Sequence, residues 1–198
     1  RSVVDFMLNR MSNFIDVIIP RGGKELVKKV QNSSSIPTIG HLEGICHSYV
    51  DKDANPKIAN KIIQNAKLRD TAICGATETI ILHEKIIKKI GIQILKNLEN
   101  NGCKIIGDKK IVQNYDGKIS KATIKDWSRE YLSTTVSVKS VKDIDEAIKH
   151  INKYGTMHTD SIITQNHKTA KKFLKKVKSS IAMHNTSTQF ADGGEFGF

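Results

Sequence analysis

Several features that would narrow the function are scarce or missing in this sequence of 198 residues. No run of 18 apolar residues occurs, so no membrane-spanning helix is predicted. Aromatic residues make up only 6% of the chain, too few for a surface that stacks nucleic-acid bases. The three cysteines, Cys46, Cys74 and Cys103, are widely spaced and odd in number, which argues against a disulfide framework and against a zinc site. We therefore expect a reducing, cytoplasmic setting and no bound metal.

The two ends of the chain also lack familiar signals. The sequence begins at Arg1 without an initiating methionine or a signal-peptide pattern, and it stops abruptly at Phe198. Both ends look cut, so we expect part of a longer protein. The hydrophobic content of 38% is that of an ordinary globular chain, long enough for one domain plus part of another.

Positive charge is plentiful, with a formal net charge of +12, but only five residues are arginines. One interpretation is binding to nucleic acid or another anionic surface. The alternative is a Lys-rich composition with solvated helix faces. The shortage of arginine and aromatic residues favours this alternative, so we expect neither nucleic acid nor membrane as a partner. A positive field would still attract a small anionic substrate.

Strand-like and helix-like patterns alternate along the chain, which is typical of α/β architecture. Asn55 before Pro56 marks one helix start, because asparagine caps helix amino ends and proline suits the first turn. Residues 104–126 are expected to hold short strands at best, and residues 185–198 a polar loop. The predicted strands are 14–19, 36–39, 46–50, 79–83, 133–138, 161–164 and 181–183, and the predicted helices are 25–30, 56–66, 84–101, 143–153 and 166–178.

Cys74 is the candidate nucleophile. It lies on a predicted loop before the strand 79–83, with Lys67 and Arg69 upstream and Gly75 directly after it. A thiol reacts as its thiolate, which nearby cations and backbone N–H groups favour. Glycine at the next position leaves the backbone free to approach a ligand closely. On the pattern alone, a buried structural cysteine remains the alternative.

A second candidate motif is Arg21-Gly22-Gly23, between a predicted strand and a predicted helix. Glycines in that position let backbone N–H groups and the helix amino end approach an anion. The spacing is not that of the dinucleotide-binding G-x-G-x-x-G pattern, so an ordinary tight turn explains the motif equally well.

Six ordered groups of residues together carry a resemblance to a known family. They lie at 19–23, at 36–37 with 44–51, at 65–67 with 74 and 78–79, at 127 with 130–132, at 145–159, and at 185–197. The chain thereby resembles the γ-glutamyl phosphate reductases, within the aldehyde dehydrogenase superfamily. The resemblance implies an α/β fold: a three-layer α/β/α catalytic domain at residues 45–198, and the tail of a Rossmann-like dinucleotide domain at residues 1–44. The family is considerably longer, so this chain would correspond to its C-terminal half, truncated at both ends.

The activity implied by the resemblance is the reduction of γ-glutamyl phosphate by NADPH, in proline biosynthesis. The products are glutamate 5-semialdehyde, phosphate and NADP. Cys74 would form a thioester with the acyl group, which divides one difficult step into two easier ones. The superfamily's side-chain oxyanion donor, an asparagine, lies outside the matched segments, so backbone N–H groups near Cys74 would be the remaining donors.

The resemblance also implies binding residues. Arg21, Gly22 and Gly23 would contact the cofactor pyrophosphate, and Glu130 the nicotinamide ribose. The substrate-side loop near the end of the chain would contribute three further residues. These are Asn185, Ser187 and Thr188.

Hydrolytic aldehyde dehydrogenases carry a Glu-Leu-Gly-Gly-Lys run whose glutamate activates water, and residues 40–44 do not match it. An acyl-phosphate reductase needs no such base. Glu43 is more simply a loop residue, and His47 and His158 are more simply structural or surface histidines, although each invites an acid–base role.

Three rival interpretations stay open. The chain could be a non-catalytic remnant of this enzyme, because no complete βαβαβ dinucleotide half is present. It could instead be a partner-dependent half that a separate N-terminal piece completes. Homo-oligomers are a further possibility for its partners. The third rival, a basic nucleic-acid module, would bind with a steep salt dependence.

Overall fold

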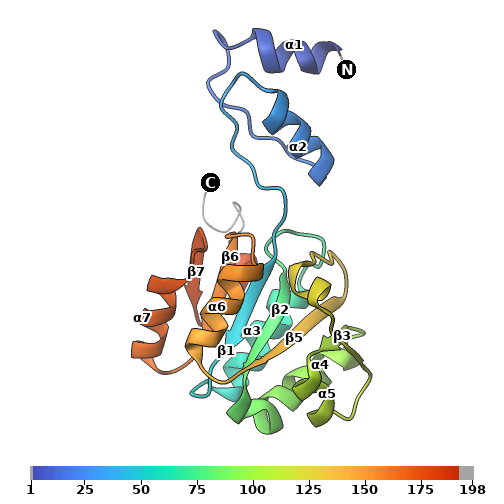
Figure 1. Ribbon diagram of the computed structural model, residues 1–198, viewed down its shortest axis with the longest axis vertical. Helices are drawn as coiled ribbons and strands as arrows, with labels where there is room; N and C mark the ends of the chain where they lie inside the picture. The colour runs from blue at the N-terminus through green and yellow to red at the C-terminus, as the bar shows by residue number, and fades with distance from the viewer. Residues whose placement is uncertain (1, 192–198) are drawn as a thin grey trace. The chain divides into compact units, whose positions relative to one another are not determined.

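The structure is a computed structural model that describes residues 2–191, and the chain forms two compact units (Figure 1). The first unit is Arg1–Glu43 and the second is Gly44–Phe198. This division falls one residue before the predicted boundary at 44/45. That the first unit derives from a dinucleotide domain stays a prediction. The resemblance motif over residues 192–197 lies outside the described residues.

The first unit consists of two helices and extended segments. Helix α1 is Ser2–Arg10 and α2 is Lys24–Ser33, and Leu8, Val27 and Val30 are buried. The predicted strands 14–19 and 36–39 are wrong, because only an isolated parallel bridge between Ile18 and Thr38 forms there. A single bridge leaves most backbone groups of these segments without a ladder partner in the described part of the unit. Apolar patterning alone therefore does not produce a strand here.

The second unit is built on a seven-stranded sheet in which each pair of neighbouring strands is parallel, in the order β4-β3-β5-β2-β1-β6-β7. Five of these strands were predicted at or near their observed positions. The central strands β1 and β2 are buried along their whole length, as expected of a parallel sheet covered on both faces. The strands are β1 Cys46–Val50, β2 Thr77–His83, β3 Lys104–Gly107, β4 Ile119–Lys121, β5 Thr135–Val141, β6 Thr159–Ile163 and β7 Ile181–His184.

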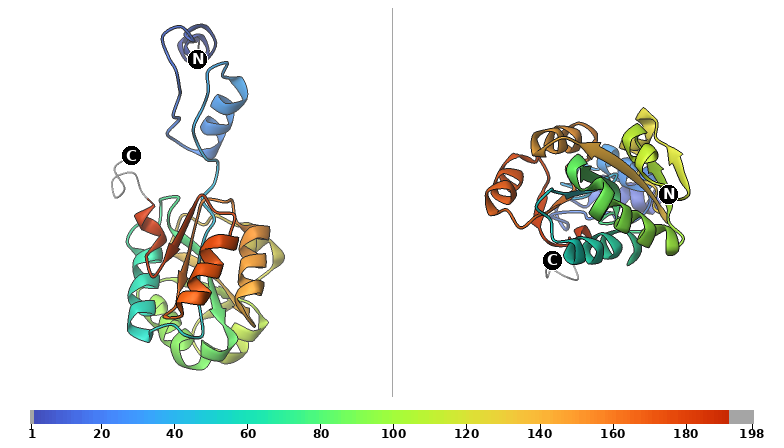
Figure 2. Two further views of the ribbon diagram at one scale, coloured as in Figure 1. Left: turned by 90° about the vertical axis from the view of Figure 1, so that its left-hand side faces the viewer. Right: turned by 90° about the horizontal axis from the view of Figure 1, so that it is seen from below.

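Helices cover both faces of this sheet, giving three layers (Figure 2). Residues alternate between the faces: Val50 and Leu82 point into one apolar core, whereas Tyr49 and Ile81 point into the other. The first core is completed by helices α3 Pro56–Leu68, α4 Ile92–Asn100 and α5 Lys109–Asn114, and the second by α6 Ile144–Tyr154 and α7 His167–Lys176.

Helix starts follow the sequence signals. Asn55, Asp143 and Asn166 each accept backbone N–H bonds through their side chains at the amino ends of α3, α6 and α7. The predicted helix 84–101 is confirmed only in part. It begins as a 3-10 turn at Glu84–Ile86, continues as a π-helix at Ile87–Gly91, and becomes α-helical in α4. Within residues 104–126, the short α5 was not predicted.

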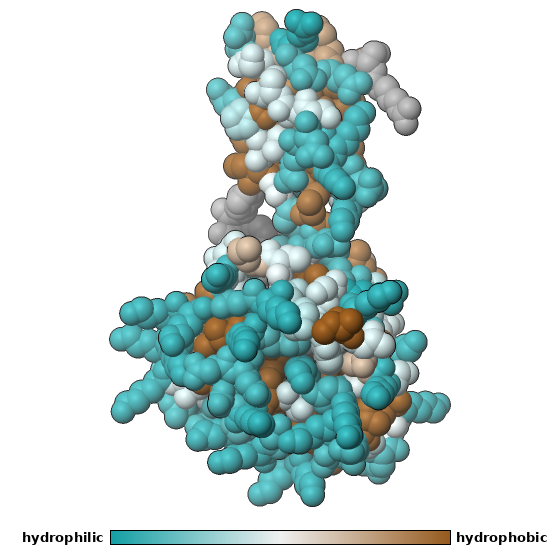
Figure 3. Space-filling model, viewed as in Figure 1, coloured by the Kyte–Doolittle hydropathy of each residue, from teal (hydrophilic) through white to brown (hydrophobic). Residues whose placement is uncertain are grey.

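Hydrophilic side chains cover most of the face of the second unit seen over α6 and α7 (Figure 3). Many are lysines of α7, whose apolar residues Ala170 and Phe173 point inward. Among residues 2–191, no helix is both long and apolar enough to cross a membrane.

Candidate active site

The candidate residues of the second unit gather at one edge of its sheet. Gly44 precedes β1, Cys74 precedes β2, Glu130 precedes β5 and His158 precedes β6. Because these strands run parallel, their amino ends lie at the same edge. The edge therefore brings together residues that are far apart in the sequence.

Cys74 lies on the loop between the end of α3 and the start of β2, as predicted, and its side chain is partly exposed. Gly44 and Gly75 let neighbouring backbone pack against this loop. A Cβ atom at Gly44 would lie 2.7 Å from the Cys74 Cβ and closer still to its carbonyl oxygen, and one at Gly75 would lie 3.2 Å from the Thr188 carbonyl oxygen. The loop that carries Cys74 is thus held from two sides by close backbone contacts, and the one at Gly44 leaves no room for a larger residue.

The other two cysteines are buried and poorly suited to nucleophilic attack. Burial, and then the charge of Asp160, raises the pKa of the Cys46 thiol well above its ordinary value. Burial raises the pKa of Cys103 to about 11. The thiolate is the reactive form, and a raised pKa makes it scarce at Cys46 and Cys103. Both side chains are also buried, whereas Cys74 is partly exposed to a reactant. Cys46 has a different task, because its Sγ donates a hydrogen bond of 3.1 Å to the Cys74 carbonyl oxygen.

A buried ion pair closes the base of the Cys74 loop. The ammonium of Lys67, in the last turn of α3, lies 2.7 Å from the carboxylate of Glu78 in β2, and both side chains are at most 1% exposed. Glu78 also accepts the backbone N–H of Leu132. Burial raises the pKa of Glu78, and the charge of Lys67 opposes that rise. The ammonium of Lys67 is thus hydrogen-bonded to Glu78, and its influence on the Cys74 thiol stays a prediction.

Gln189 is a residue of this site that sequence reasoning missed. Its side-chain amide is buried and donates to the carbonyl oxygens of Ala66, at 3.0 Å, and Asp70, at 2.9 Å. It thus ties the segment after β7 to the end of α3 and the Cys74 loop. A glutamine in a polar, Gly-rich stretch gives no sequence signal for such long-range contacts.

The predicted substrate residues separate into two places. The Thr188 hydroxyl lies 2.9 Å from that of Thr77 at the start of β2, and Thr188 packs behind Gly75. Ser187 is buried and caps the short turn at residues 188–190. Asn185 instead bonds the backbone N–H and carbonyl of Thr164, just after β6 ends. The structure therefore places Asn185 at the opposite edge from Cys74.

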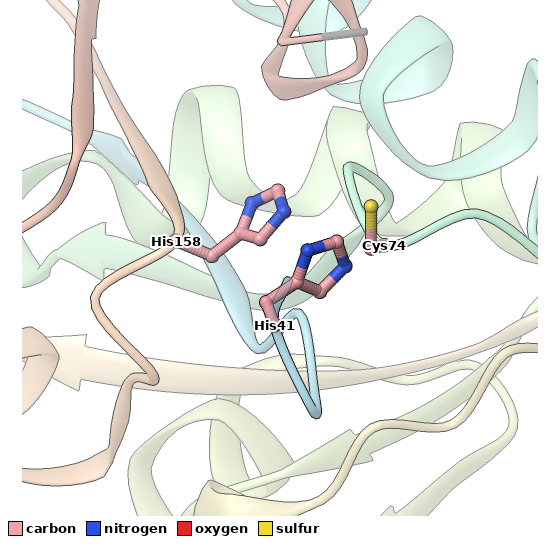
Figure 4. Close-up of side chains that lie close together, drawn as sticks. All are labelled: His41, Cys74 and His158. Carbon is pink, nitrogen blue, oxygen red and sulfur yellow. The ribbon is translucent and has the colours of Figure 1, made fainter. Parts of the chain in front are cut away.

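Two histidines have different settings. His47 is fully buried with its Nδ1 2.8 Å from the Asp160 carboxylate, which is a structural role. His158 is partly exposed, and one of its ring nitrogens lies within 4.8 Å of the Cys74 Sγ (Figure 4). His41, which is also drawn in Figure 4, belongs to the first unit.

Glu130 is partly buried, and its carboxylate accepts the backbone N–H of Gly44 at 2.7 Å. This bond fixes the chain just before β1. In the first unit, Arg21, Gly22 and Gly23 are exposed and lead into α2, as predicted. Gly22 has φ +148°, and a Cβ at Gly23 would meet nothing within 4 Å. Glu43 forms an ion pair with Lys24, in keeping with its interpretation as a loop residue.

Replacing Gly44 by alanine is expected to destabilise the second unit by about 1–3 kcal/mol, because the added methyl overlaps backbone that cannot swing aside. Urea unfolding measures this change. Gly23→Ala is the control, since φ there is −68° and the methyl enters open space. Equal midpoints for Gly44→Ala and the parent chain would show that the packing around Cys74 is looser than described.

The sequence of this chain is similar to those of known proteins. The aldehyde dehydrogenase family model matches residues 120–197. The γ-glutamyl phosphate reductase of Methylocella silvestris is 47% identical over 198 residues, covering 100% of this chain and 46% of that protein. That of Parvibaculum lavamentivorans is 46% identical over 197 residues, again covering 46% of the relative. The chain thus spans about half the length of the curated relatives it matches.

Solved structures show the same likeness. The γ-glutamyl phosphate reductase of Thermotoga maritima superposes with a TM-score of 0.93 at 38% identity, covering 100% of this chain and 47% of that chain. The NADP-dependent glyceraldehyde-3-phosphate dehydrogenase of Bacillus halodurans has a TM-score of 0.74 at 16% identity, covering 95% and 47%, which shows the fold alone.

The parallel sheet between two helical layers is an α/β fold shared with solved aldehyde dehydrogenase-like structures, and in this chain a cysteine lies on the loop into a central strand. Within that class, the chain resembles the γ-glutamyl phosphate reductases, as its sequence motifs predict.

Proposed function

We propose that this chain carries the catalytic half of a γ-glutamyl phosphate reductase, which reduces γ-glutamyl phosphate to glutamate 5-semialdehyde and phosphate with NADPH. The observation that supports this most strongly is that Cys74 is partly exposed at the sheet edge, whereas Cys46 and Cys103 are buried. Because the chain spans about half the length of its curated relatives, the complete reaction is proposed for it together with the segments that complete those proteins. None of Cys46, Cys74 and Cys103 forms a disulfide, as suits the cytoplasmic setting that we propose.

The proposed chemistry begins with Cys74. Its thiolate attacks the acyl carbon of the substrate, and the bond between that carbon and the bridging phosphate oxygen breaks. Inorganic phosphate leaves, and a thioester remains on the protein. Lys67, Glu78 and Gln189 hold the two ends of the loop, which keeps the sulfur in place during the attack. Backbone N–H groups of the same loop are the proposed donors to the oxyanion.

Two groups of residues, one in each unit, are proposed to contact NADPH. Gly23 offers open space in front of the amino end of α2, where a pyrophosphate could approach backbone N–H groups. Glu130 carries a carboxylate suited to a ribose hydroxyl, although its present bond to Gly44 uses one oxygen. When bound, NADPH supplies the hydride that reduces the thioester. Arg21 and Gly22 are proposed to assist at the pyrophosphate, and Thr188 and Ser187 near the substrate.

Alkylation by iodoacetamide at neutral pH tests the proposed nucleophile. Cys74 is expected to react well before Cys46 and Cys103, because the rate follows thiolate fraction and access. Peptide mass spectrometry after short exposures gives the three rates, and labelling in denaturant checks that every peptide is detected. Similar rates for all three cysteines in the folded protein would refute Cys74 as an activated thiol.

A further inference from the structure

His158 lies close to the sulfur of Cys74, the proposed nucleophile. The residue lies just before β6, and a ring nitrogen is within 4.8 Å of the Cys74 Sγ (Figure 4). A thiol proton can pass to an imidazole across such a gap after a small rotation of either side chain, since catalytic hydrogen bonds often tighten only with substrate.

The hydrogen bonds of His158 distinguish its two ring nitrogens. Nδ1 lies 2.9 Å from the Thr159 hydroxyl and 3.6 Å from the Cys46 Sγ. The Cys46 thiol donates its proton to the Cys74 carbonyl oxygen, so its sulfur can only accept from Nδ1. The Thr159 hydroxyl can accept as well as donate, and we assign the tautomer in which Nδ1 carries the hydrogen. Nε2 then holds a lone pair. When it takes up a proton, the Nδ1 bond to Thr159 is unaffected.

The backbone around His158 is fixed independently of its ring. Met157 has a left-handed φ of 59°, and its carbonyl oxygen accepts the Ser180 N–H at 2.8 Å. The His158 carbonyl oxygen accepts the Ile181 N–H at 3.1 Å. The start of β7 thus holds this turn in place, and a strained conformation kept at a site edge is consistent with a functional position.

His47 and His150, two other histidines of the second unit, are poorly placed to act as a base for Cys74. His47 is hydrogen-bonded to Asp160 within the sheet, and His150 forms edge-on ring contacts with His47 and Trp127 on the α6 side. Burial lowers the pKa of His150 to about 3. Cys46 is no competing proton source, because its thiol bonds the Cys74 carbonyl oxygen.

We propose that His158 is the general base that accepts the Cys74 thiol proton and the acid that later returns a proton when the sulfur leaves. This inference rests on the proposed role of Cys74. In the first step the S–H bond breaks, an N–H bond forms at Nε2, and a thiolate–imidazolium pair results. In the last step the sulfur leaves the reduced carbon with its electron pair, and the imidazolium protonates it.

The carboxylates near this edge of the sheet affect the charges of Cys74 and His158. Asp160 lies behind the edge, bonded to His47, and Glu78 is paired with Lys67. Glu130 faces the edge from the segment before β5. These carboxylates oppose a lone thiolate but favour an imidazolium. A proton shared between Cys74 and His158 therefore suits this environment better than an isolated thiolate does.

The test is the pH dependence of Cys74 alkylation by iodoacetamide in the full chain. In the parent protein, the apparent midpoint is expected below the ordinary cysteine value of about 8.5. In His158→Gln and His158→Asn, neither of which can take a proton at neutral pH, the midpoint should rise and the rate at pH 7 should fall about tenfold. His167→Gln, an exposed histidine at the start of α7 on the other edge of the sheet, is the matched control and should leave the profile unchanged.

Thermal unfolding shows whether each variant is folded, and two substitutions of different length guard against one that fails to fold. Unchanged midpoints in folded His158→Gln and His158→Asn, with Cys74 still the fastest cysteine, would overturn the role of His158 and leave the proposed function standing. If Cys74 is not the fastest cysteine in the parent chain, the proposed function fails, and this inference fails with it.

Discussion

Replacing Lys67 by methionine is expected to destabilise the second unit by about 3–5 kcal/mol, because it leaves the Glu78 carboxylate buried without its cation. The methionine side chain fills a similar volume, so packing is largely preserved. Urea unfolding at pH 7 measures the change in free energy of unfolding. The expected loss is larger than for most single substitutions, since a stranded buried charge is among the costliest defects in a protein.

The double variant Lys67→Met/Glu78→Gln is the control that separates charge from packing. Its neutral amide can still accept the Leu132 N–H, and we expect it to recover most of the lost stability. If the double variant is as unstable as the single one, packing around Lys67 matters more than the ion pair.

The same pair gives the expected sign of a pH effect. The pKa of Glu78 is raised above its ordinary value in the folded chain, so the native state binds this proton more tightly than the unfolded state does. The stability that this proton contributes is present at pH values below the pKa of Glu78 in the unfolded chain, about 4.5. It is lost as the pH rises through the higher pKa of Glu78 in the folded chain. The defect of Lys67→Met should therefore shrink on acidification and be largest at neutral pH. A defect that grows on acidification would contradict this assignment.

Local signals in the sequence predicted much of the fold of the second unit. Asn55 and Asn166 mark helix starts because a cap is a contact between near neighbours in the chain. The loop that carries Cys74 follows similarly from the end of a helical pattern and the start of a β-branched run. Such features depend on residues only a few positions apart.

What the sequence could not show depends on contacts across the fold. The Lys67–Glu78 pair needs the turn at the end of α3 to bring β2 back alongside it. The position of Asn185 at the far edge follows from where β7 ends, which no motif encodes. The strand predicted at 14–19 failed for a related reason, since a strand needs neighbours and the described part of the first unit provides one bridge.

Replacing Cys74 by serine is expected to lower acyl transfer from an acyl phosphate to this position by at least about 10³-fold, since loss of the nucleophile in a complete covalent site costs on the order of 10⁶. A hydroxyl at this place lacks the accessible thiolate on which attack depends. Cys103→Ser is the matched control, because it removes a buried thiol elsewhere and should leave the transfer unchanged. Equal transfer in Cys74→Ser and the parent chain would exclude a thioester at this residue.

The measurement that tests the central claim most directly is acylation of the chain by acetyl phosphate, a small acyl phosphate whose transfer requires no nicotinamide cofactor. Peptides are prepared at acid pH and analysed by mass spectrometry before and after treatment with hydroxylamine, which cleaves thioesters and leaves lysine amides intact. Our account predicts a hydroxylamine-sensitive acetyl group on Cys74 that forms ahead of any on Cys46 or Cys103 and is absent in Cys74→Ser. Acetyl groups confined to lysines, with Cys74 unmodified, would contradict it.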